Sequence, residues 1–494
     1  MQDMAGTPKV SSDQRLSDLA ALPALGRRRL VLGLAQAGLL SLLPTAVHCA
    51  PELWVHNVTR LYSVPVAGIE HPRSAAEIAA ALRAWPGQVA VGGGHFSMGG
   101  QVAIAGGLQL DLRGMRALVW LRPEQMRVRV QAGMSWRDLQ DHLDPLGLAI
   151  KTMQSYANFS IGGSVSVNCH GRYVGHGPVG RTVQALQLVL ADGRIVEASR
   201  SENAELFRAA LGGYGALAVI SEVELDLARN CKIRREVKSL ALADYPAYFQ
   251  REVLARGDCV LHNADLLPPR FDQPVAVSWR RCPDGTALTE TARLVPRGAS
   301  YRLEQSLIWA MSELPGGALL RSQVVHPLLS AGKAVQWLNH EASLDVAQLE
   351  PRQRRHSSYV LQEYFIPPRH FLSFTRAMAA LLRQRQVMAL NVSIRHAPPD
   401  SDSLLPWAKE EVFCFVLYYK QGTDENAQAL VAGWTRELIA LALEHEGRYY
   451  LPYQLHASRA QFERAYPEVS ELRRLKQAHD PAGKLSNQLW ARYL

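Results

Sequence analysis

The chain has 494 residues, too many for one compact core, so we expect two or more domains. Hydrophobic residues make up 48% and charged residues 20%, a balance that is typical of folded globular proteins and excludes a largely disordered chain. The net charge of +9 arises partly from arginine clusters at residues 27–29 and 352–355, with which no aromatic residues alternate. It predicts a solvated surface or attraction to anionic groups, and no nucleic-acid partner. The six cysteines show no short Cys/His spacing, so we expect no metal site, and their disulfide state stays open.

The N-terminus carries a basic cluster followed by an apolar run. Arg27, Arg28 and Arg29 precede residues 30–47, which glycines and a proline interrupt. This run is too short and too interrupted for a stable transmembrane span. A basic segment before an apolar one is typical of a signal peptide, and the paired arginines favour twin-arginine export to the periplasm over a cytoplasmic location. The alternative is an amphipathic N-terminal helix of a cytosolic protein. Residues 1–50 are therefore assigned to targeting, with the cleavage position open.

Short helices and strands alternate after residue 51. Pro72 and Ser74 mark the start of a helix over 72–84, and an apolar strand over 88–91 runs directly into glycines. Strands are predicted over 108–112 and over 126–132, where apolar and polar residues alternate. The next helix is expected over 136–146, followed by the segments 183–190 and 195–196, which the turn Ala191-Asp192-Gly193-Arg194 joins into a hairpin, and by a strand over 216–227.

The middle of the chain, residues 230–444, has longer strand-like and helical runs. Its strands are expected to form one sheet that helices cover. The predicted strands cover 275–279, 359–365, 389–395 and 412–419, and the predicted helices cover 369–385 and 426–444. From Gly447 onward the chain is predicted to be short and helical.

The first glycine-rich loop lies at residues 91–101, VGGGHFSMGGQ. Glycines let the backbone approach a bulky anion closely, and successive exposed amides form an anion-binding nest. The pattern is not GxGxxG and no Rossmann unit surrounds it, so a nicotinamide site is a poor fit. Taken alone, a tight loop with an incidental histidine explains it equally well.

Two further glycine clusters follow. Residues 160–171, SIGGSVSVNCHG, contain a second diglycine before small residues and a Cys-His-Gly sequence. Residues 210–227, ALGGYGALAVISEVELDL, supply a third cluster and a strand. In order and spacing these features, from residue 61 to residue 227, resemble the PCMH-type FAD-binding domain of the vanillyl-alcohol oxidase family.

The resemblance implies a two-domain α+β fold. We expect a PCMH-type FAD-binding domain at 51–228, then a substrate domain at 229–445 with a mixed or antiparallel sheet covered by helices. Residues 446–494 are expected to return to the flavin domain. The cofactor is expected to be FAD.

The resemblance also places the cofactor residues. In that family the first loop embraces the pyrophosphate, and the histidine after the glycines, here His95, often bonds covalently to the flavin 8α-methyl group. A neutral imidazole is a competent nucleophile for that bond. Phe96 separates His95 from Ser97, where many relatives read Gly-His-Ser, and Tyr156 stands where bicovalent members carry a cysteine, so we expect a single linkage. The expected cofactor-binding residues are Gly92, Gly93, Gly94, His95, Phe96, Ser97, Gln101, Ser160, Gly162, Gly163, Ser166, His170, Gly171 and Ile220.

Within the family the chain looks closest to sugar-lactone and alditol oxidases. The sequence LNVSIR at 390–395 is similar to their strand that ends in an active-site arginine, which implies that Arg395 lies over the flavin and stabilises its anionic reduced form. Ser393 stands where those enzymes have a glutamate, and Cys414 where they have a histidine. His456 falls at the position of a late lysine and is our candidate base, because histidine titrates near neutrality.

The expected enzyme is an FAD-dependent oxidase or dehydrogenase that oxidises a CH–OH group of a polyol, sugar or lactone-like small molecule by hydride transfer to flavin N5. Oxygen or another acceptor takes the electrons. The sequences GHFSMGGQ and YLPYQLHAS are also similar to cytokinin dehydrogenases, so amine oxidation is the first alternative, and a flavin-binding electron carrier without its own substrate is the second. A purely structural role stays open for four residues. Arg395 is then a surface residue of a strand, His456 a core or capping histidine, Cys169 a small buried residue and Glu363 a carboxylate at a sheet edge.

Overall fold

The structure, a computed structural model, describes residues 53–313, 334–350 and 354–494. The export signal expected within residues 1–50 lies outside the described residues. Residues 51–494 form one unit by their contacts. Among the described residues, no helix has both the length and the apolar character that a membrane crossing requires.

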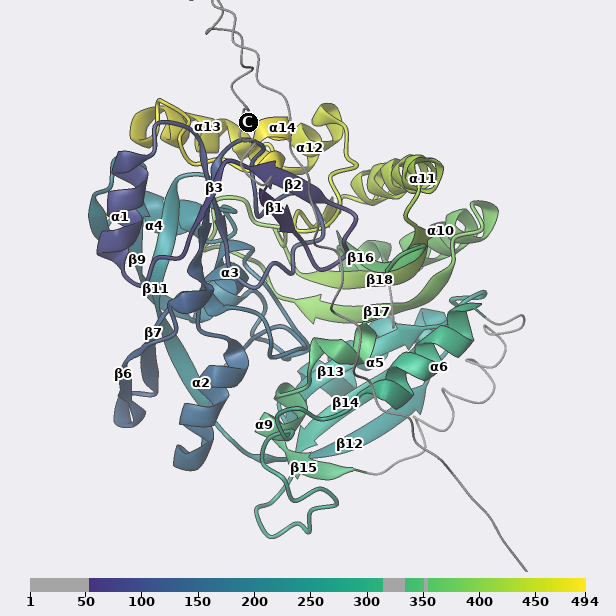
Figure 1. The fold of residues 1–494 in the computed structure, drawn as a ribbon. Coiled ribbons are helices and arrows are strands. Elements are labelled where there is room, and N and C mark those ends of the chain that lie inside the picture. Colours follow the sequence, from purple (N-terminus) through teal and green to yellow (C-terminus); the bar gives the residue numbers. More distant parts are fainter. Residues whose placement is uncertain (1–52, 314–333, 351–353) are drawn as a thin grey trace, which may run out of the picture. The chain divides into compact units, whose positions relative to one another are not determined.

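The first half contains a small parallel sheet and a larger antiparallel one (Figure 1). The parallel sheet has the order β3 (Gly68–Glu70), β5 (Leu108–Asp111), β4 (Val89–Gly92). The antiparallel sheet has the order β10 (Ile195–Ser199), β9 (Val183–Leu190), β11 (Ala218–Arg229), β7 (Arg127–Gln131), β6 (Leu118–Arg122), and β8 (Leu148–Ile150) also pairs with β11. A separate hairpin consists of β1 (Leu53–His56) and β2 (Ser63–Val66). The helices of this half are α1 (Ala75–Ala84), α2 (Trp136–Leu143), α3 (Ile161–Ser166) and α4 (Ala204–Ala210).

Local sequence signals set the ends of these helices. Ser74 caps α1 by accepting a hydrogen bond from Glu77 N (3.2 Å), so the helix begins at Ala75 and not at Pro72 as expected. A capping box between Ser135 and Asp138 begins α2, which passes into a short 3₁₀ turn that contains a proline, before the predicted end at residue 146. Both helices were predicted from their patterns, and only their bounds differ.

The second half is built on an eight-stranded antiparallel sheet. Its order is β15 (Val335–Trp337), β12 (Lys232–Ser239), β14 (Val275–Arg281), β13 (Cys259–Leu266), β17 (Ala389–Ala397), β18 (Val412–Gly422), β16 (Ser357–Ile366), β19 (Arg448–Tyr449). The helices among the described residues of this part are α5 (Tyr245–Tyr248), α6 (Arg302–Glu313), α9 (Leu338–Ala342), α10 (Phe371–Gln384) and α11 (Glu425–Glu444). The expected α+β class, with a helix-covered sheet in the second half, is confirmed.

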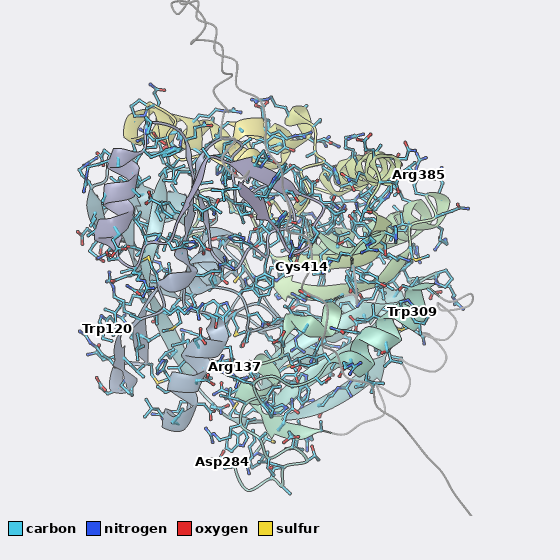
Figure 2. All side chains as sticks on the ribbon, viewed as in Figure 1. Trp120, Arg137, Asp284, Trp309, Arg385 and Cys414 are labelled. Atoms are coloured by element: carbon cyan, nitrogen blue, oxygen red, sulfur yellow. The ribbon has the colours of Figure 1, made fainter. Side chains whose placement is uncertain are left out.

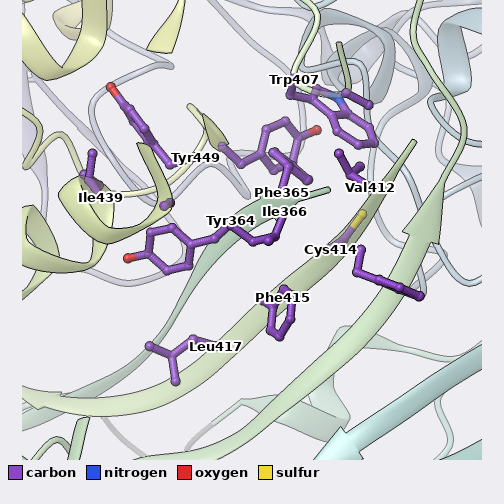
Figure 3. Close-up of a cluster of buried hydrophobic side chains, with 14 of the residues drawn as sticks. Tyr364, Phe365, Ile366, Trp407, Val412, Cys414, Phe415, Leu417, Ile439 and Tyr449 are labelled. Atoms are coloured by element: carbon purple, nitrogen blue, oxygen red, sulfur yellow. The ribbon is translucent and has the colours of Figure 1, made fainter. Parts of the chain in front are cut away.

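A large apolar cluster lies where α10 and α11 pack on β16, β17 and β18. Figure 3 shows part of it, including Tyr364, Phe415 and Leu417, and Figure 2 shows Cys414 in the interior while Trp120 and Arg385 lie at the periphery. The side chains of Tyr364, Phe415 and Leu417 are at most 1% exposed, and aromatic pairs such as Phe374 with Phe415 (ring centroids 5.0 Å apart) add to the packing. One face of the sheet is therefore fixed by apolar burial, which leaves the other face for polar residues.

The chain ends with α12 (Arg459–Ala465), α13 (Val469–His479) and α14 (Gln488–Tyr493), and the last two contact the first half through Lys476 and Trp490. Leu485 forms a parallel bridge with Val89 of β4, the strand that precedes the glycine loop. Lys484 Nζ donates to Leu82 O at 2.6 Å, and Trp490 Nε1 donates to Gly213 O at 3.0 Å. The last residues thus hold the base of β4 and its following loop in position.

Candidate active site

A single cavity of about 400 Å³ brings together the glycine clusters of the first half and one face of the eight-stranded sheet. On the first side lie the loop after β4, the α3 region and the start of β11. On the second side lie alternate residues of β13, β17, β18 and β16. Segments that are up to about 350 residues apart thereby share one site, as in the hydrogen bond from Gln101 Nε2 to Leu451 O (2.7 Å), which ties the glycine loop to the chain's last part.

The glycine loop and the N-terminal end of α3 are interlocked. Gly94 N donates to Ser160 Oγ at 3.2 Å, and a Cβ added at Gly93 would lie 2.2 Å from the same oxygen. A Cβ added at Gly162 would lie 2.5 Å from Ala132 Cβ, because Gly162 N donates to Ala132 O at 2.8 Å. The glycines at these positions are therefore needed for close backbone approach.

His95 occupies the turn of this loop with a positive φ of 58°. Its Nδ1 lies 3.2 Å from His56 O, whereas its buried Nε2 has no hydrogen-bond partner. Burial, and secondarily the Arg113 guanidinium, lowers the pKa of His95 below its ordinary value of 6.5. The imidazole is therefore neutral at physiological pH and keeps a lone pair available.

The sheet side of the cavity presents polar residues in register. Asp265 of β13 pairs with Ser393 of β17, which in turn pairs with Val416 of β18. Asn391 Nδ2 donates to Asp265 Oδ1 at 3.3 Å. Arg395, two residues after Ser393 and therefore on the same face, has a buried Nε without a hydrogen-bond partner.

A buried cluster lies where β16 meets the segment after α3 and the segment after β19. His170 Nε2 is 2.5 Å from Glu363 Oε1, and their side chains are 3% and 2% exposed. Tyr453 Oη donates to Glu363 Oε2 at 3.2 Å. All three residues line the cavity. Burial and the Glu363 carboxylate raise the pKa of Tyr453 well above its ordinary value, so the phenol keeps its proton.

A charged pair stands at the Arg172 end of the cavity. Arg172 Nη1 is 2.7 Å from Glu341 Oε1, and Glu341 Oε2 accepts a hydrogen bond from Gln336 Nε2 at 2.7 Å. Tyr156, also a lining residue, is buried next to Arg172 and Arg395, and burial raises its pKa. The cavity therefore carries permanent positive charge from two arginines beside neutral hydroxyl groups.

The cysteines of the described residues are free thiols. Burial raises the pKa of Cys169, which lines the cavity, and of Cys414, which does not. His170, Glu363 and Cys414 form the one group in the described ranges that offers three metal-ligand atoms within 4.8 Å of one another. Because the Cys414 thiol keeps its proton and both Glu363 oxygens already accept hydrogen bonds, the group is arranged as a hydrogen-bonded cluster.

The structure brings most of the residues expected from the sequence to this cavity. Those that line it are Gly93, Gly94, His95, Phe96, Ser97, Gln101, Ser160, Gly162, Gly163, Ser166, His170, Ile220 and Arg395. Gly92 and Gly171 lie just behind the lining, where an added Cβ would meet His95 Nε2 at 2.5 Å and Met153 O at 2.0 Å, respectively.

His456, the candidate base from the sequence, does not line the cavity. Tyr453, three residues earlier, reaches the cavity instead. Burial, followed by Arg436 and Arg492, lowers the pKa of His456 to about 4, and its Nε2 is buried without a partner. His456 is therefore a neutral, buried histidine, which agrees with the purely structural role that the sequence left open.

Other lining residues were not expected from the sequence. They include the polar residues Arg172, Asn263, Asp265, Asn391 and Tyr453. A partial signal exists in the strand sequences Asn263-Ala264-Asp265 and Asn391-Val392-Ser393, where polar residues alternate with apolar ones. Only the strand pairing reveals that these two segments face the same space.

The residues present fit FAD. Gly93, Gly94, Gly162 and Gly163 line the cavity, so backbone without side chains faces the space that a pyrophosphate would occupy. The buried Nε2 of His95 and the buried Nε of Arg395 lack protein partners. A buried polar atom without a partner is costly unless a bound group satisfies it.

Comparisons with known proteins agree with this reading of the site. Residues 66–199 match the FAD binding domain family. The chain is 25% identical over 405 residues to L-gulonolactone oxidase of Bos taurus, an alignment that covers 80% of this chain and 87% of the relative. It is 30% identical over 178 residues to alditol oxidase of Streptomyces sp. (35% and 41% covered) and 33% identical over 185 residues to cytokinin dehydrogenase 5 of Oryza sativa subsp. japonica (34% and 34% covered). The expected PCMH-type FAD-binding domain and FAD cofactor are confirmed.

Proposed function

We propose that this chain, an FAD-dependent oxidoreductase, oxidises a CH–OH group of a polyol or sugar lactone. The observation that carries the proposal is the polar sheet face opposite the glycine loop, where Asp265, Asn391 and Ser393 stand side by side. Carboxylate, amide and hydroxyl groups in one row offer several donors and acceptors to a small molecule rich in hydroxyl groups. The names of two relatives point the same way, because one gives a sugar lactone and the other an alditol as substrate.

The loop from Gly93 to Gln101, with Ser160 and the α3 glycines, would hold FAD. Bound FAD supplies the two-electron chemistry, because it accepts a hydride from a substrate carbon. Arg395 contributes a permanent positive charge to a buried site, which stabilises negative charge that develops during the reaction. The apolar packing behind the sheet excludes water from that charge.

A single covalent bond between His95 and the flavin is part of the proposal. Support comes from the neutral imidazole and its unpartnered Nε2. The test is the colour of acid-precipitated protein together with the mass of the peptide that contains His95. A yellow precipitate with a flavin-modified peptide supports the bond, and a colourless precipitate with unmodified His95 contradicts it while leaving FAD binding intact.

The function is tested by anaerobic mixing of the holoprotein with a panel of substrates. Sugar lactones and alditols are expected to bleach the oxidised flavin spectrum. N6-isoprenyl adenine is the comparison substrate, because residues 91–101 and the match to a cytokinin dehydrogenase favour amine oxidation as the second candidate. Bleaching by the adenine alone would replace the proposal, and photoreducible protein that no substrate bleaches would indicate an electron carrier. Timing reoxidation in air then separates an oxidase from a dehydrogenase.

Export by the twin-arginine route is a separate proposal that rests on residues 27–47. Replacing Arg27 and Arg28 by lysine is expected to keep the protein in the cytoplasm, which fractionation of the cells measures. Unchanged periplasmic recovery of the variant would argue against that route.

A further inference from the structure

Glu363 stands on the cavity face of the eight-stranded sheet. On β18, Val416 pairs with Glu363 of β16 on one side and with Ser393 of β17 on the other. Directly opposite residues of an antiparallel sheet point to the same face. Ser393 stands where sugar-lactone and alditol oxidases are expected to have a glutamate. In this chain the carboxylate of Glu363 lies in the same row of the sheet, two strands from Ser393.

The carboxylate is held from two directions. His170 Nε2 lies 2.5 Å from Oε1, and Tyr453 Oη donates to Oε2 at 3.2 Å. Trp407, with its ring centroid 4.8 Å from that of His170, and Phe365, at 5.9 Å, pack against the imidazole, and Figure 3 shows these two aromatic rings in the apolar cluster. Neither contact is local in sequence, so three separate segments converge to fix one carboxyl group.

The hydrogen-bond pattern assigns the proton positions. His170 Nδ1 is buried and has no partner. With the hydrogen on Nε2, the ring donates to Glu363 and leaves only a lone pair unsatisfied. A protonated ring would instead leave a buried charged N–H without an acceptor, which costs more. Glu363 therefore accepts hydrogen bonds from His170 and Tyr453.

This buried carboxylate has no structural partner of opposite permanent charge. Within the described residues, no lysine or arginine nitrogen lies within 4.0 Å of Glu363, whose only ion-pair contact is with His170. Burying a carboxylate without a cation is expensive for stability. Such a group that also lines a cavity is a candidate for chemistry.

We propose that Glu363 is the catalytic residue that accepts the hydroxyl proton of the substrate, with His170 and Tyr453 as its positioning residues. The inference rests on the proposed function. When the substrate C–H bond breaks, its hydrogen would leave as a hydride, with both electrons of the bond, and FAD, when bound, would supply the acceptor. The O–H bond breaks and its proton passes to a carboxylate oxygen of Glu363, while the C–O bond becomes C=O. The carboxylic acid then returns the proton to solvent.

The test compares Glu363→Gln with the matched variant Glu411→Gln. Glu411, the residue before β18, makes the same kind of contact, 2.7 Å from His396 Nε2 of β17, and lies outside the cavity lining. In anaerobic rapid mixing, the rate of flavin reduction is expected to fall by about 10²–10⁴-fold in Glu363→Gln, the usual contribution of a general base. In Glu411→Gln it is expected to stay within about twofold, because a partly exposed pair contributes little.

Two further readouts separate catalysis from structure. Substrate binding to oxidised Glu363→Gln holoprotein, measured by spectral perturbation, and its FAD content are expected to match the wild type, so the rate is lost without loss of binding.

Two variants address the hydrogen-bond donors and folding. Tyr453→Phe removes one donor and keeps the ring, so a smaller loss, about tenfold, is expected for a misplaced carboxylate. If Glu363→Gln fails to fold or to bind FAD, Glu363→Asp carries the test, since it keeps the charge but withdraws it by one methylene, and a loss of at least about tenfold is expected.

The outcomes are distinguishable. A folded, FAD-loaded Glu363→Gln that is reduced as fast as a reactive wild type overturns the inference alone. A wild type that no lactone or alditol reduces overturns the proposed function and, with it, the reaction that Glu363 would serve.

Discussion

Gly162 of α3 packs against Ala132, the residue after β7, and its replacement by alanine has an effect that can be estimated. Gly162 is buried, and its backbone N donates to Ala132 O at 2.8 Å, while Ala132 N donates to Ser221 O at 2.9 Å. In Gly162→Ala the new Cβ would lie 2.5 Å from Ala132 Cβ and 3.0 Å from both Ala132 Cα and Ala132 O. Two of these three neighbours are backbone atoms in a hydrogen-bonded strand end, so α3 has to move.

The expected cost follows from this overlap. Overpacking a tightly packed contact costs about 1–3 kcal/mol, and the gain in helix propensity on replacing glycine by alanine returns up to about 1 kcal/mol. A net loss of about 1–2 kcal/mol in the free energy of unfolding is therefore expected. Because α3 carries Gly163 and Ser166, which line the cavity, FAD affinity is expected to fall about tenfold, equivalent to about 1.4 kcal/mol.

Urea unfolding of the apoprotein and fluorescence titration with FAD measure the two effects. The double variant Gly162→Ala/Ala132→Gly removes the shortest contact but leaves those to Ala132 Cα and Ala132 O, so it should recover only part of the loss. A Gly162→Ala protein that unfolds within about 0.5 kcal/mol of the wild type, and binds FAD equally well, would refute the argument that close approach requires this glycine.

Three further changes have expected outcomes. His95→Ala should yield protein whose flavin is released on acid precipitation, and a flavin that still stays bound would point to a different attachment residue. Gly433→Ala in α11, where an added Cβ meets nothing within 4 Å, should stabilise the apoprotein by about 0.5–1 kcal/mol, and a loss in urea unfolding would count against the packing of that helix. His262 is bonded to Tyr245 Oη (3.0 Å) and Ser278 Oγ (2.9 Å), and burial lowers its pKa to about 3. The unfolded histidine binds a proton below pH 6.5, whereas the folded one does not until about pH 3, so the free energy of unfolding should fall by about 1.4 kcal/mol per pH unit on acidification between these values. His262→Gln should remove this contribution to the slope. An unchanged slope in the variant would contradict the role of His262.

The sequence predicted the flavin side of the site well because its glycines are concentrated in two short segments. An added Cβ at Gly93, Gly94, Gly162 or Gly163 would lie 2.2–2.7 Å from an atom of Ser160, Phe96 or Ala132, and such clusters of required glycines are visible in the sequence itself. The hairpin over 183–196 was equally predictable, since turn residues separate two apolar runs.

The substrate side was less predictable because strand pairing assembles it. Glu363 was weighed as a sheet-edge carboxylate, yet β16 has neighbours on both sides, and Tyr450 N, just after the two-residue strand β19, donates to Glu363 O at 3.0 Å. A strand that short has no periodic pattern. The strand β12 was missed for a related reason, because its sequence KIRREVKS is mostly charged and only Ile233 is buried.

The assignment of His456 shows the limit of alignment to a motif. Its position in the sequence matched a family lysine, but the chain beyond Pro452 places Tyr453 in the cavity lining and His456 outside it. Tyr453 and His456 are only three residues apart, yet one lines the cavity and the other does not. Nothing in the sequence around His456 shows whether its side chain reaches the cavity.

The most direct test of the account is the anaerobic rate of flavin reduction by a sugar lactone or alditol that carries either hydrogen or deuterium on the carbon to be oxidised. We expect the holoprotein to be bleached by the protiated substrate and more slowly by the deuterated one, because breaking that C–H bond is the redox step. A bound flavin that keeps its oxidised spectrum at saturating concentrations of every lactone and alditol would contradict the central claim.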